Sequence, residues 1–249
     1  MSETRSVAVL LYHHVGPERE PRCRGLTVSP EAFARHVSTL SAMGYTAITP
    51  DDWVSYVHGA SEIPERCVMI TFDDAYQDLV EHALPVLERK SFPATVFVPT
   101  SLTGKSIQCN PRENDATLPL MTSSEIEEWA SRGVIFGAHS RNHIDLTACP
   151  VVVARGEIEG SQNDLMKLTR GRVGAFAYPY GKVNEDVEEM VDKCYDIAFT
   201  TVEGMNDSAT PLTQMRRTMV QHGDTIVDVL LRARYGKSVL QTIRNVVRA

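Results

Sequence analysis

The chain has 249 residues, of which 43% are hydrophobic and 23% are charged, and it carries a formal net charge of −7. This composition is ordinary for a globular protein with a sizeable core, and the length suits one domain spanning residues 1–249. The acidic balance, without any run of Lys or Arg, argues against a nucleic-acid partner, because such a partner requires a surface that neutralises phosphates.

The amino-terminal residues predict neither a secretion signal nor a membrane span. Residues 1–6 are polar, and the apolar run at residues 7–11 is far shorter than the ~20 residues of a membrane helix. The five cysteines include no CxxC pair, which is typical of free thiols in a reducing compartment. They are Cys23, Cys67, Cys109, Cys149 and Cys194. These features predict a cytoplasmic protein.

Apolar strand patterns alternate with helical patterns along the chain. In order, we expect a strand at 7–11, a helix at 30–43, a strand at 67–72, a helix at 76–90, a strand at 93–99, a helix from 123, a strand at 134–138, a helix at 151–168, a strand at 173–177, a helix at 185–194, a strand at 197–200 and a helix at 226–233. Short strands that are repeatedly followed by helices predict an α/β fold, a (β/α) barrel of about seven parallel strands.

Several local features refine this pattern. Ser29 is expected to cap the helix at 30–43 with Pro30 at its first position, and Ser123 is expected to open a capped helix. The longest irregular stretch, residues 102–120, is either a surface excursion or a loop that covers the substrate. Trp53 and Trp129 lie on predicted helices, where packing is the favoured interpretation.

Three short segments place polar groups at the end of an apolar strand, which is where barrel enzymes build their active sites. The first is the pair Asp73 and Asp74, after residues 67–72. Adjacent carboxylates repel each other unless a cation or hydrogen-bond donors lie between them. An isolated pair of this kind is more often a solvated turn, with Asp74 capping the next helix.

The second segment begins at His139 and ends at His143, directly after the predicted strand at 134–138. Two imidazoles at this spacing can reach one cation if the segment turns, and with one carboxylate they form a ligand set typical of catalytic zinc. By itself the spacing is weak evidence, because a single His is often a hydrogen-bonded packing residue.

In the third segment, a strand ends in the turn Pro179-Tyr180-Gly181. One interpretation is a turn that only ends the strand. The other is a turn that presents a backbone N–H to the site, where it stabilises a developing oxyanion.

Together the segments, which read TFDD, HSRNH and PYG in this order, resemble the polysaccharide deacetylase family, carbohydrate esterase family 4, whose shared unit is the NodB-homology domain. The start of the chain, where Tyr12-His13-His14-Val15 follows Leu11, is similar to the Y-H-x-V motif of one branch of that family. The resemblance covers about residues 7–235. It implies a distorted (β/α) barrel in a single catalytic domain.

The resemblance also implies roles for individual residues. Asp74, His139 and His143 would hold a divalent metal, Asp73 would be the general base, and the N–H of Tyr180 would contact the oxyanion. Zn²⁺ is the favoured metal, and Ni²⁺, Co²⁺ or Fe²⁺ would fit the same ligand types. Tyr76 and Tyr180 are expected to line the cleft.

The chain departs from the common family pattern in two places. An Arg is missing near the third motif, where the chain has Ala177 and Tyr178, and Arg217 is a candidate to replace it in orienting the base. For the general acid, His13 on the first strand is favoured over His222, the only late histidine. A buried structural histidine is the alternative interpretation of His13.

The function implied is metal-dependent removal of an N-acetyl group from an amino sugar in a saccharide, a glycolipid or a natural-product intermediate. Two alternatives stay open: a deacylase of another amide, such as a formamido sugar or a cyclic ureide, and a silent metal- or sugar-binding homologue. The sequence indicates an N-acetylated amino sugar as partner and does not indicate an oligomeric state.

Overall fold

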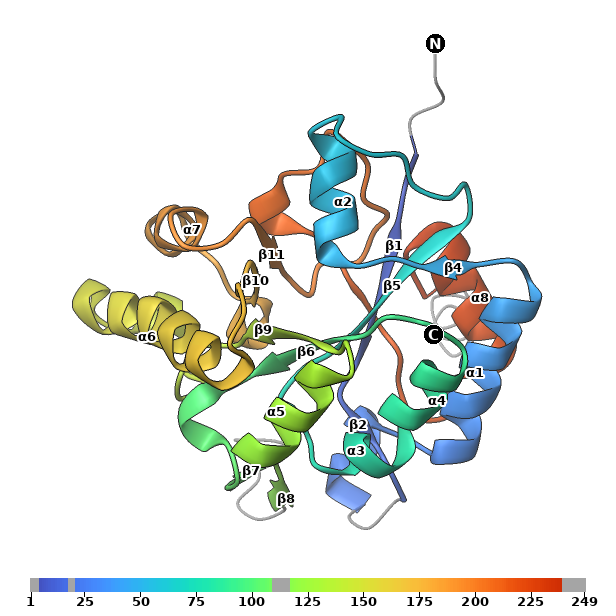
Figure 1. Ribbon diagram of the computed structural model, residues 1–249, viewed down its shortest axis with the longest axis horizontal. Coiled ribbons are helices and arrows are strands. Elements are labelled where there is room, and N and C mark those ends of the chain that lie inside the picture. The colour runs from blue at the N-terminus through green and yellow to red at the C-terminus, as the bar shows by residue number, and fades with distance from the viewer. Residues whose placement is uncertain (1–4, 18–20, 109–116, 239–249) are drawn as a thin grey trace, which may run out of the picture.

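The computed structural model of the protein describes residues 5–17, 21–108 and 117–238. Its centre is a curled parallel sheet with helices on its outer face (Figure 1). In the described part of the chain, no helix is both long enough and apolar enough to cross a membrane.

Seven strands follow one path through the sheet, in the order β11-β10-β9-β6-β5-β1-β12. They are β1 (Ala8–Tyr12), β5 (Cys67–Phe72), β6 (Thr95–Val98), β9 (Ile135–Ala138), β10 (Ala175–Ala177), β11 (Ile197–Phe199) and β12 (Thr218–Met219). Short β4 (Thr46–Ala47) pairs with the start of β5. A parallel bridge from Phe199 to Met215, ahead of β12, links the two ends of the path, so the prediction of a distorted parallel barrel is confirmed.

The helices cover the outer face and one end of this barrel (Figure 1). They are α1 (Pro30–Ala42), α2 (Pro50–Val57), α3 (Asp78–His82), α4 (Leu84–Arg89), α5 (Ser123–Ser131), α6 (Val151–Thr169), α7 (Glu185–Asp192) and α8 (Ile226–Tyr235). Two short strand pairs lie outside the main sheet, β2 (His14–Val15) with β3 (Thr27–Val28), and β7 (Ser106–Gln108) with β8 (Thr117–Pro119).

Alternation of side chains along the strands creates two apolar cores. Residues such as Leu10, Ile70 and Phe176 pack against the outer helices. Their neighbours along the strands fill the barrel interior together with Trp53 of α2; these neighbours include Val9, Met69, Phe97 and Phe199. Trp53 is fully buried and Trp129 nearly so, which confirms the prediction of helix packing for both.

Several local predictions need correction. The helix expected at residues 76–90 is split into α3 and α4, because Pro85 has no N–H to continue the helical hydrogen bonds. Ser29 caps α1 as predicted. The cap of α5, however, is Thr122 in a capping box with Glu125, and Ser123 is the first helical residue. The described ends of the stretch 102–120 include β7 and β8.

The cysteines differ from the expectation of uniformly free thiols. Cys67, Cys149 and Cys194 are free. Cys23, which is buried in the 3₁₀ helix Pro21–Leu26, is disulfide-bonded, so the prediction is wrong at this position. Cys109 lies outside the described residues. The cytoplasmic location inferred from free thiols thus loses part of its support.

Candidate active site

The candidate residues gather at the carboxyl ends of the parallel strands. Asp73 and Asp74 follow β5, His139 follows β9, and His13 follows β1. Strand alternation explains the direction of two of them. Met69 points into the barrel, so residues 71 and 73, two and four positions later, point inward as well. Val9 also points inward, and the same alternation directs His13, four positions later, into the barrel.

Asp74, His139 and His143 form a cluster that could hold a metal ion, with one potential ligand atom from each within 4.8 Å of the others. Asp74 Oδ1 lies 3.2 Å from His143 Nε2 and 3.8 Å from His139 Nε2. This carboxylate oxygen is buried and has no hydrogen-bond partner among the described residues. A buried oxygen of this kind needs a cation or a donor, so the donor set fits a divalent metal.

Main-chain contact fixes the orientation of His139. Its Nδ1 donates a hydrogen bond of 2.7 Å to the carbonyl oxygen of Ala177, at the end of β10. The proton is therefore on Nδ1 and the Nε2 lone pair faces Asp74, which is the tautomer that a metal ligand requires. Burial lowers the pKa of His139 to about 4, although Asp73 opposes this shift, so the neutral form persists well below pH 7.

Asp73 is held by Arg217 from the segment that leads into β12. Arg217 Nη1 and Nη2 donate to the two Asp73 carboxylate oxygens at 2.6 Å and 2.8 Å, and Arg217 Nε donates to the Thr200 carbonyl oxygen. Arg217 is 0% exposed. Burial by itself would raise the pKa of Asp73, but the Arg217 charge and its hydrogen bonds outweigh burial and hold this pKa far below its usual range.

The backbone of the site is strained at several positions. Asp74, Ser140, His143 and Tyr180 all have positive φ angles, between 54° and 71°. Residues other than glycine rarely adopt this conformation, which persists only where the surroundings enforce it. In Ser140 the side chain contributes, since its Oγ accepts a hydrogen bond from the N–H of His143 at 3.0 Å.

The two tyrosines expected at the cleft differ in exposure. Tyr180 is 44% exposed, its ring centroid lies 4.7 Å from that of His143, and its hydroxyl donates to the His143 carbonyl oxygen. Tyr76 is 1% exposed, so its ring offers no open surface on which a substrate could stack. Burial raises the pKa of Tyr76 and the Asp74 carboxylate raises it further.

The two histidines considered as general acid lie in different surroundings. His13 is half-buried and feels the charges of Asp73, Asp74, Arg217 and His143, and its Nδ1 has no hydrogen-bond partner among the described residues. Burial lowers the pKa of His13 and the two carboxylates oppose that shift. His222 instead lines a groove between α1 and α8.

His14 is a buried residue that the sequence analysis did not single out. Its Nε2 lies 2.7 Å from Asp78 Oδ2, and its ring packs edge-on against Tyr76. These contacts connect β2 with α3, next to the Asp73 and Asp74 turn. The only available signal was a second histidine beside His13 in a predicted strand end.

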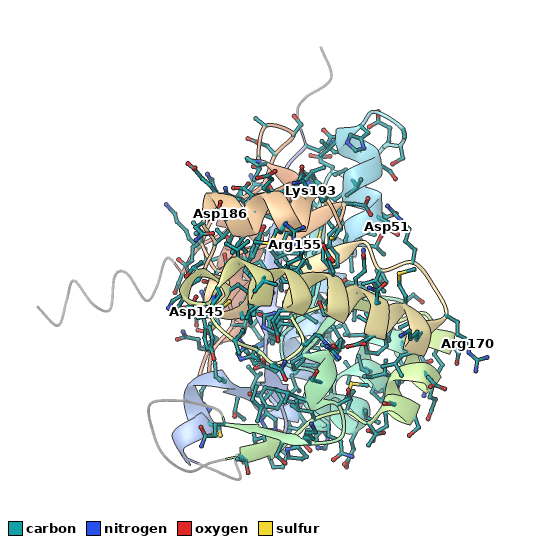
Figure 2. The ribbon with its side chains drawn as sticks, turned by 90° about the vertical axis from the view of Figure 1, so that its left-hand side faces the viewer. Asp51, Asp145, Arg155, Arg170, Asp186 and Lys193 are labelled. Atoms are coloured by element: carbon teal, nitrogen blue, oxygen red, sulfur yellow. The ribbon has the colours of Figure 1, made fainter. Side chains whose placement is uncertain are left out.

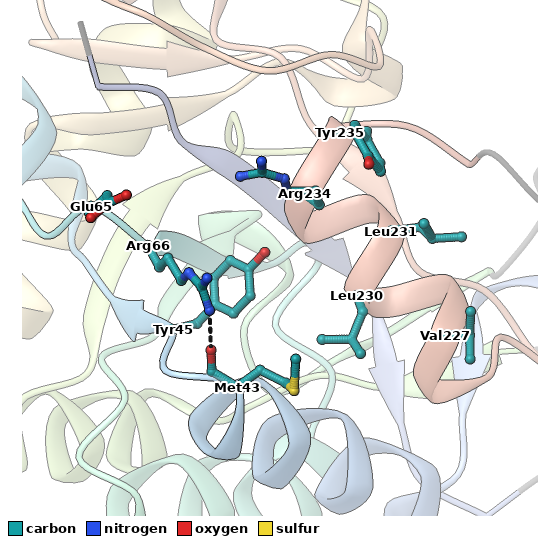
Figure 3. Close-up of a pocket in the computed structure, with 9 residues that line it drawn as sticks. All are labelled: Met43, Tyr45, Glu65, Arg66, Val227, Leu230, Leu231, Arg234 and Tyr235. Atoms are coloured by element: carbon teal, nitrogen blue, oxygen red, sulfur yellow. Dashed lines mark hydrogen bonds between the residues drawn. The ribbon is translucent and has the colours of Figure 1, made fainter. Parts of the chain in front are cut away.

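One hollow of the structure is separate from this site. It has a volume of about 530 Å³ and lies between α8 and the loops at Met43, Tyr45 and Arg66 (Figure 3). Arg66 Nη1 donates to the Met43 carbonyl oxygen on the side of the hollow that faces α8. Tyr45 and Arg66 directly precede β4 and β5, so this hollow lies at the amino ends of the strands, opposite the end that carries Asp73.

The polysaccharide deacetylase family matches residues 60–196, which is more than half of the chain. The poly-beta-1,6-N-acetyl-D-glucosamine N-deacetylase of Staphylococcus epidermidis is 26% identical over 223 residues, with 81% of this chain and 74% of that protein covered.

Two solved structures are similar over most of the chain. The deacetylase PplD of Streptococcus pyogenes has a TM-score of 0.80 at 24% identity, covering 91% of this chain and 97% of that one, which is a likeness of fold. The polysaccharide deacetylase BC0361 of Bacillus cereus has a TM-score of 0.78 at 25% identity, covering 92% and 69%. The chain belongs to the polysaccharide deacetylase family, whose members are hydrolases that act on N-acetyl amides.

Proposed function

We propose that this protein removes the acetyl group from N-acetylated amino sugars in a saccharide, with Asp74, His139 and His143 as metal ligands and Asp73 as general base. One observation carries the proposal: the three-residue cluster lies beside a carboxylate that a buried arginine holds in place. We infer a single catalytic domain, with its core at about residues 7–235.

The cluster fits a divalent cation, and two imidazoles with one carboxylate favour Zn²⁺. When bound there, the cation supplies Lewis acidity, which polarises an amide carbonyl and makes water acidic enough to lose a proton near neutral pH. The neutral Nε2 of His139 favours this binding, because no proton has to be displaced from it.

The residues of the chain then move the protons. Asp73 remains ionised because of Arg217, and it takes a proton from the attacking water while Arg217 keeps its carboxylate oriented. The N–H of Tyr180 contacts the carbonyl oxygen as charge develops on it. His13 gives a proton to the departing nitrogen. The products are acetate and a free amine, and the proton gained at Asp73 balances the one given by His13.

The aromatic ring of Tyr180 supports a sugar substrate. It is exposed beside His143, and exposed aromatic rings stack on the apolar faces of sugars. The similarity to the Staphylococcus epidermidis enzyme favours N-acetylglucosamine residues as the first substrates to examine.

The alternative of a silent homologue rested on the missing arginine of the third motif. The two hydrogen bonds from Arg217 to the Asp73 carboxylate support Arg217 as its replacement. The site thus has a charge partner for its proposed base, which supports an active enzyme.

The decisive experiment is the substitution Asp73→Asn, with the matched control Asp51→Asn on the exposed side of α2. We expect acetate release from N-acetylglucosamine oligomers to fall by ~10²–10⁴-fold, as for loss of a general base, while the protein still binds Zn²⁺. Turnover at the rate of the control with metal still bound would contradict the proposal. Measuring formate beside acetate on formylated and acetylated sugars separates this function from a deformylase.

A further inference from the structure

The turn that connects His139 to His143 needs support from outside itself. Ser140 and His143 have φ angles of 58° and 54°, a conformation that side-chain-bearing residues rarely adopt. The carbonyl oxygens of Ser140 and Arg141 accept hydrogen bonds from Thr100 and Ser101. These bonds fix one edge of the turn, and they leave the N–H groups of its central residues to find other partners.

Glu157 of α6 supplies those partners. Its Oε2 accepts hydrogen bonds from the N–H groups of Arg141 and Asn142, at 2.9 Å and 2.8 Å, and its Oε1 accepts one from Asn142 Nδ2 at 2.6 Å. The residue is only 7% exposed. Three donors thus converge on one carboxylate, directly before the ligand His143.

The same face of α6 accommodates the rest of the turn. At Gly160, a Cβ atom would lie 2.5 Å from Arg141 Cδ, so this glycine leaves room for the arginine side chain. One helical turn further, Asp164 Oδ2 accepts hydrogen bonds from Arg141 Nε at 2.9 Å and from Thr100 Oγ1 at 3.0 Å. In Figure 2, α6 lies across the front of the molecule, and its carboxyl end is marked by the labelled Arg170. Glu157 and Asp164 of α6 therefore both accept hydrogen bonds from the 140–143 turn, and Gly160 leaves space for a side chain of that turn.

We propose that Glu157 is a positioning residue of the metal site, which holds the 140–143 turn so that His143 Nε2 stays near Asp74 Oδ1. The inference rests on the function proposed above, because it takes Asp74, His139 and His143 as the ligands. A carboxylate suits this task because both of its oxygens accept hydrogen bonds, whereas a glutamine has one accepting oxygen and turns an NH₂ group toward at least one of the donors of the turn.

The test is the affinity for metal alone, measured without substrate. Co²⁺ is titrated into the metal-free protein and its visible absorption is followed, and Zn²⁺ affinity is measured by competition with a chelator. We expect Glu157→Gln to weaken both affinities by ~10–100-fold, the range found when a partner that orients metal ligands is lost. Glu159→Gln is the matched control, since this residue lies on the exposed face of α6 and pairs only with Arg155 among the described residues.

Asn142→Ala provides a second, milder variant on the exposed side of the turn. It deletes one of the three contacts to Glu157, so we expect a smaller loss of affinity, and it decides the matter if Glu157→Gln does not fold. A purely structural role would lower the unfolding temperature of the metal-free protein and leave the metal affinity of the folded protein unchanged. Wild-type affinity in the folded variants would overturn the proposal, whereas a wild-type protein that binds Co²⁺ but releases no acetate would contradict only the proposed function.

Discussion

Arg217 forms hydrogen bonds to both carboxylate oxygens of Asp73, although 144 residues separate the two in the chain. The pair is buried, and the arginine is anchored at its other side by the Thr200 carbonyl oxygen. This arrangement fixes both the charge and the direction of the carboxylate that we propose as the base.

Arg217→Lys should lower kcat/KM by ~10²-fold, because a single ammonium group cannot pair with both oxygens and the carboxylate loses its fixed direction. The pKa of Asp73 should rise as well, so the acidic limb of the kcat/KM profile should move to higher pH. Arg216→Lys, at the exposed neighbouring position, is the control. An acidic limb in the same place for both variants would argue against a role of Arg217 at Asp73.

His13→Gln should affect amide substrates far more than activated esters. An amine is a poor leaving group that needs a proton, so loss of a general acid should slow amide hydrolysis by ~10²–10⁴-fold. An acetate ester with an acidic phenol as leaving group needs no such proton and should be hydrolysed at nearly the wild-type rate. His222→Gln, in the groove between α1 and α8, should leave both reactions unchanged. If His222→Gln slowed amide hydrolysis and His13→Gln did not, His222 would be the general acid.

Removal of the metal should abolish acetate release, and Zn²⁺ or Co²⁺ should restore it. Bound metal should also raise the unfolding temperature, since a ligand that binds only the folded state stabilises that state. His143→Ala should lose this thermal shift because it removes one of the three proposed ligands. Full hydrolysis in protein shown by elemental analysis to be metal-free would rule out the mechanism.

His36 should make the folded protein less stable in mild acid. It is buried, its Nε2 donates to the Asp224 carbonyl oxygen, and its Nδ1 accepts from the Tyr12 hydroxyl, so both ring nitrogens are satisfied in the neutral form. Burial accordingly lowers the pKa of His36. In the unfolded chain the ring titrates near ~6.5, so the unfolded state binds more protons below that pH and stability falls as the pH falls.

The measurement is the free energy of unfolding of wild-type protein and His36→Gln between pH 7.5 and pH 5, both without metal. The wild type should lose more stability over this interval than the variant, because other buried histidines contribute equally to both. Parallel curves would show that His36 titrates alike in the folded and unfolded states.

The sequence was sufficient to predict the barrel because each long strand carries its own apolar, β-branched signal. Strands of two residues, such as β4 and β12, were missed, since two residues have no readable periodicity. The interruption between α3 and α4 could have been anticipated from Pro85, whose missing N–H breaks the helical pattern.

The residues of the candidate site differ in how clearly the sequence indicated them. Asp73, Asp74, His139 and His143 stand out because they are polar groups directly after apolar strands. Glu157 gave no such signal. It lies on a long helix among other acidic residues, and two of its three partners are main-chain N–H groups, which leave no trace in a sequence.

The hydrogen bond from His139 to Ala177 has a related consequence for mutagenesis. The acceptor that orients this imidazole is a carbonyl oxygen of the main chain, and every amino acid at position 177 carries the same group. An alanine scan would therefore pass over one of the contacts on which the geometry of the site depends. Replacing the peptide bond after Ala177 with an ester would weaken that carbonyl as an acceptor, and it would also remove the Tyr178 N–H that donates to the Phe199 carbonyl oxygen.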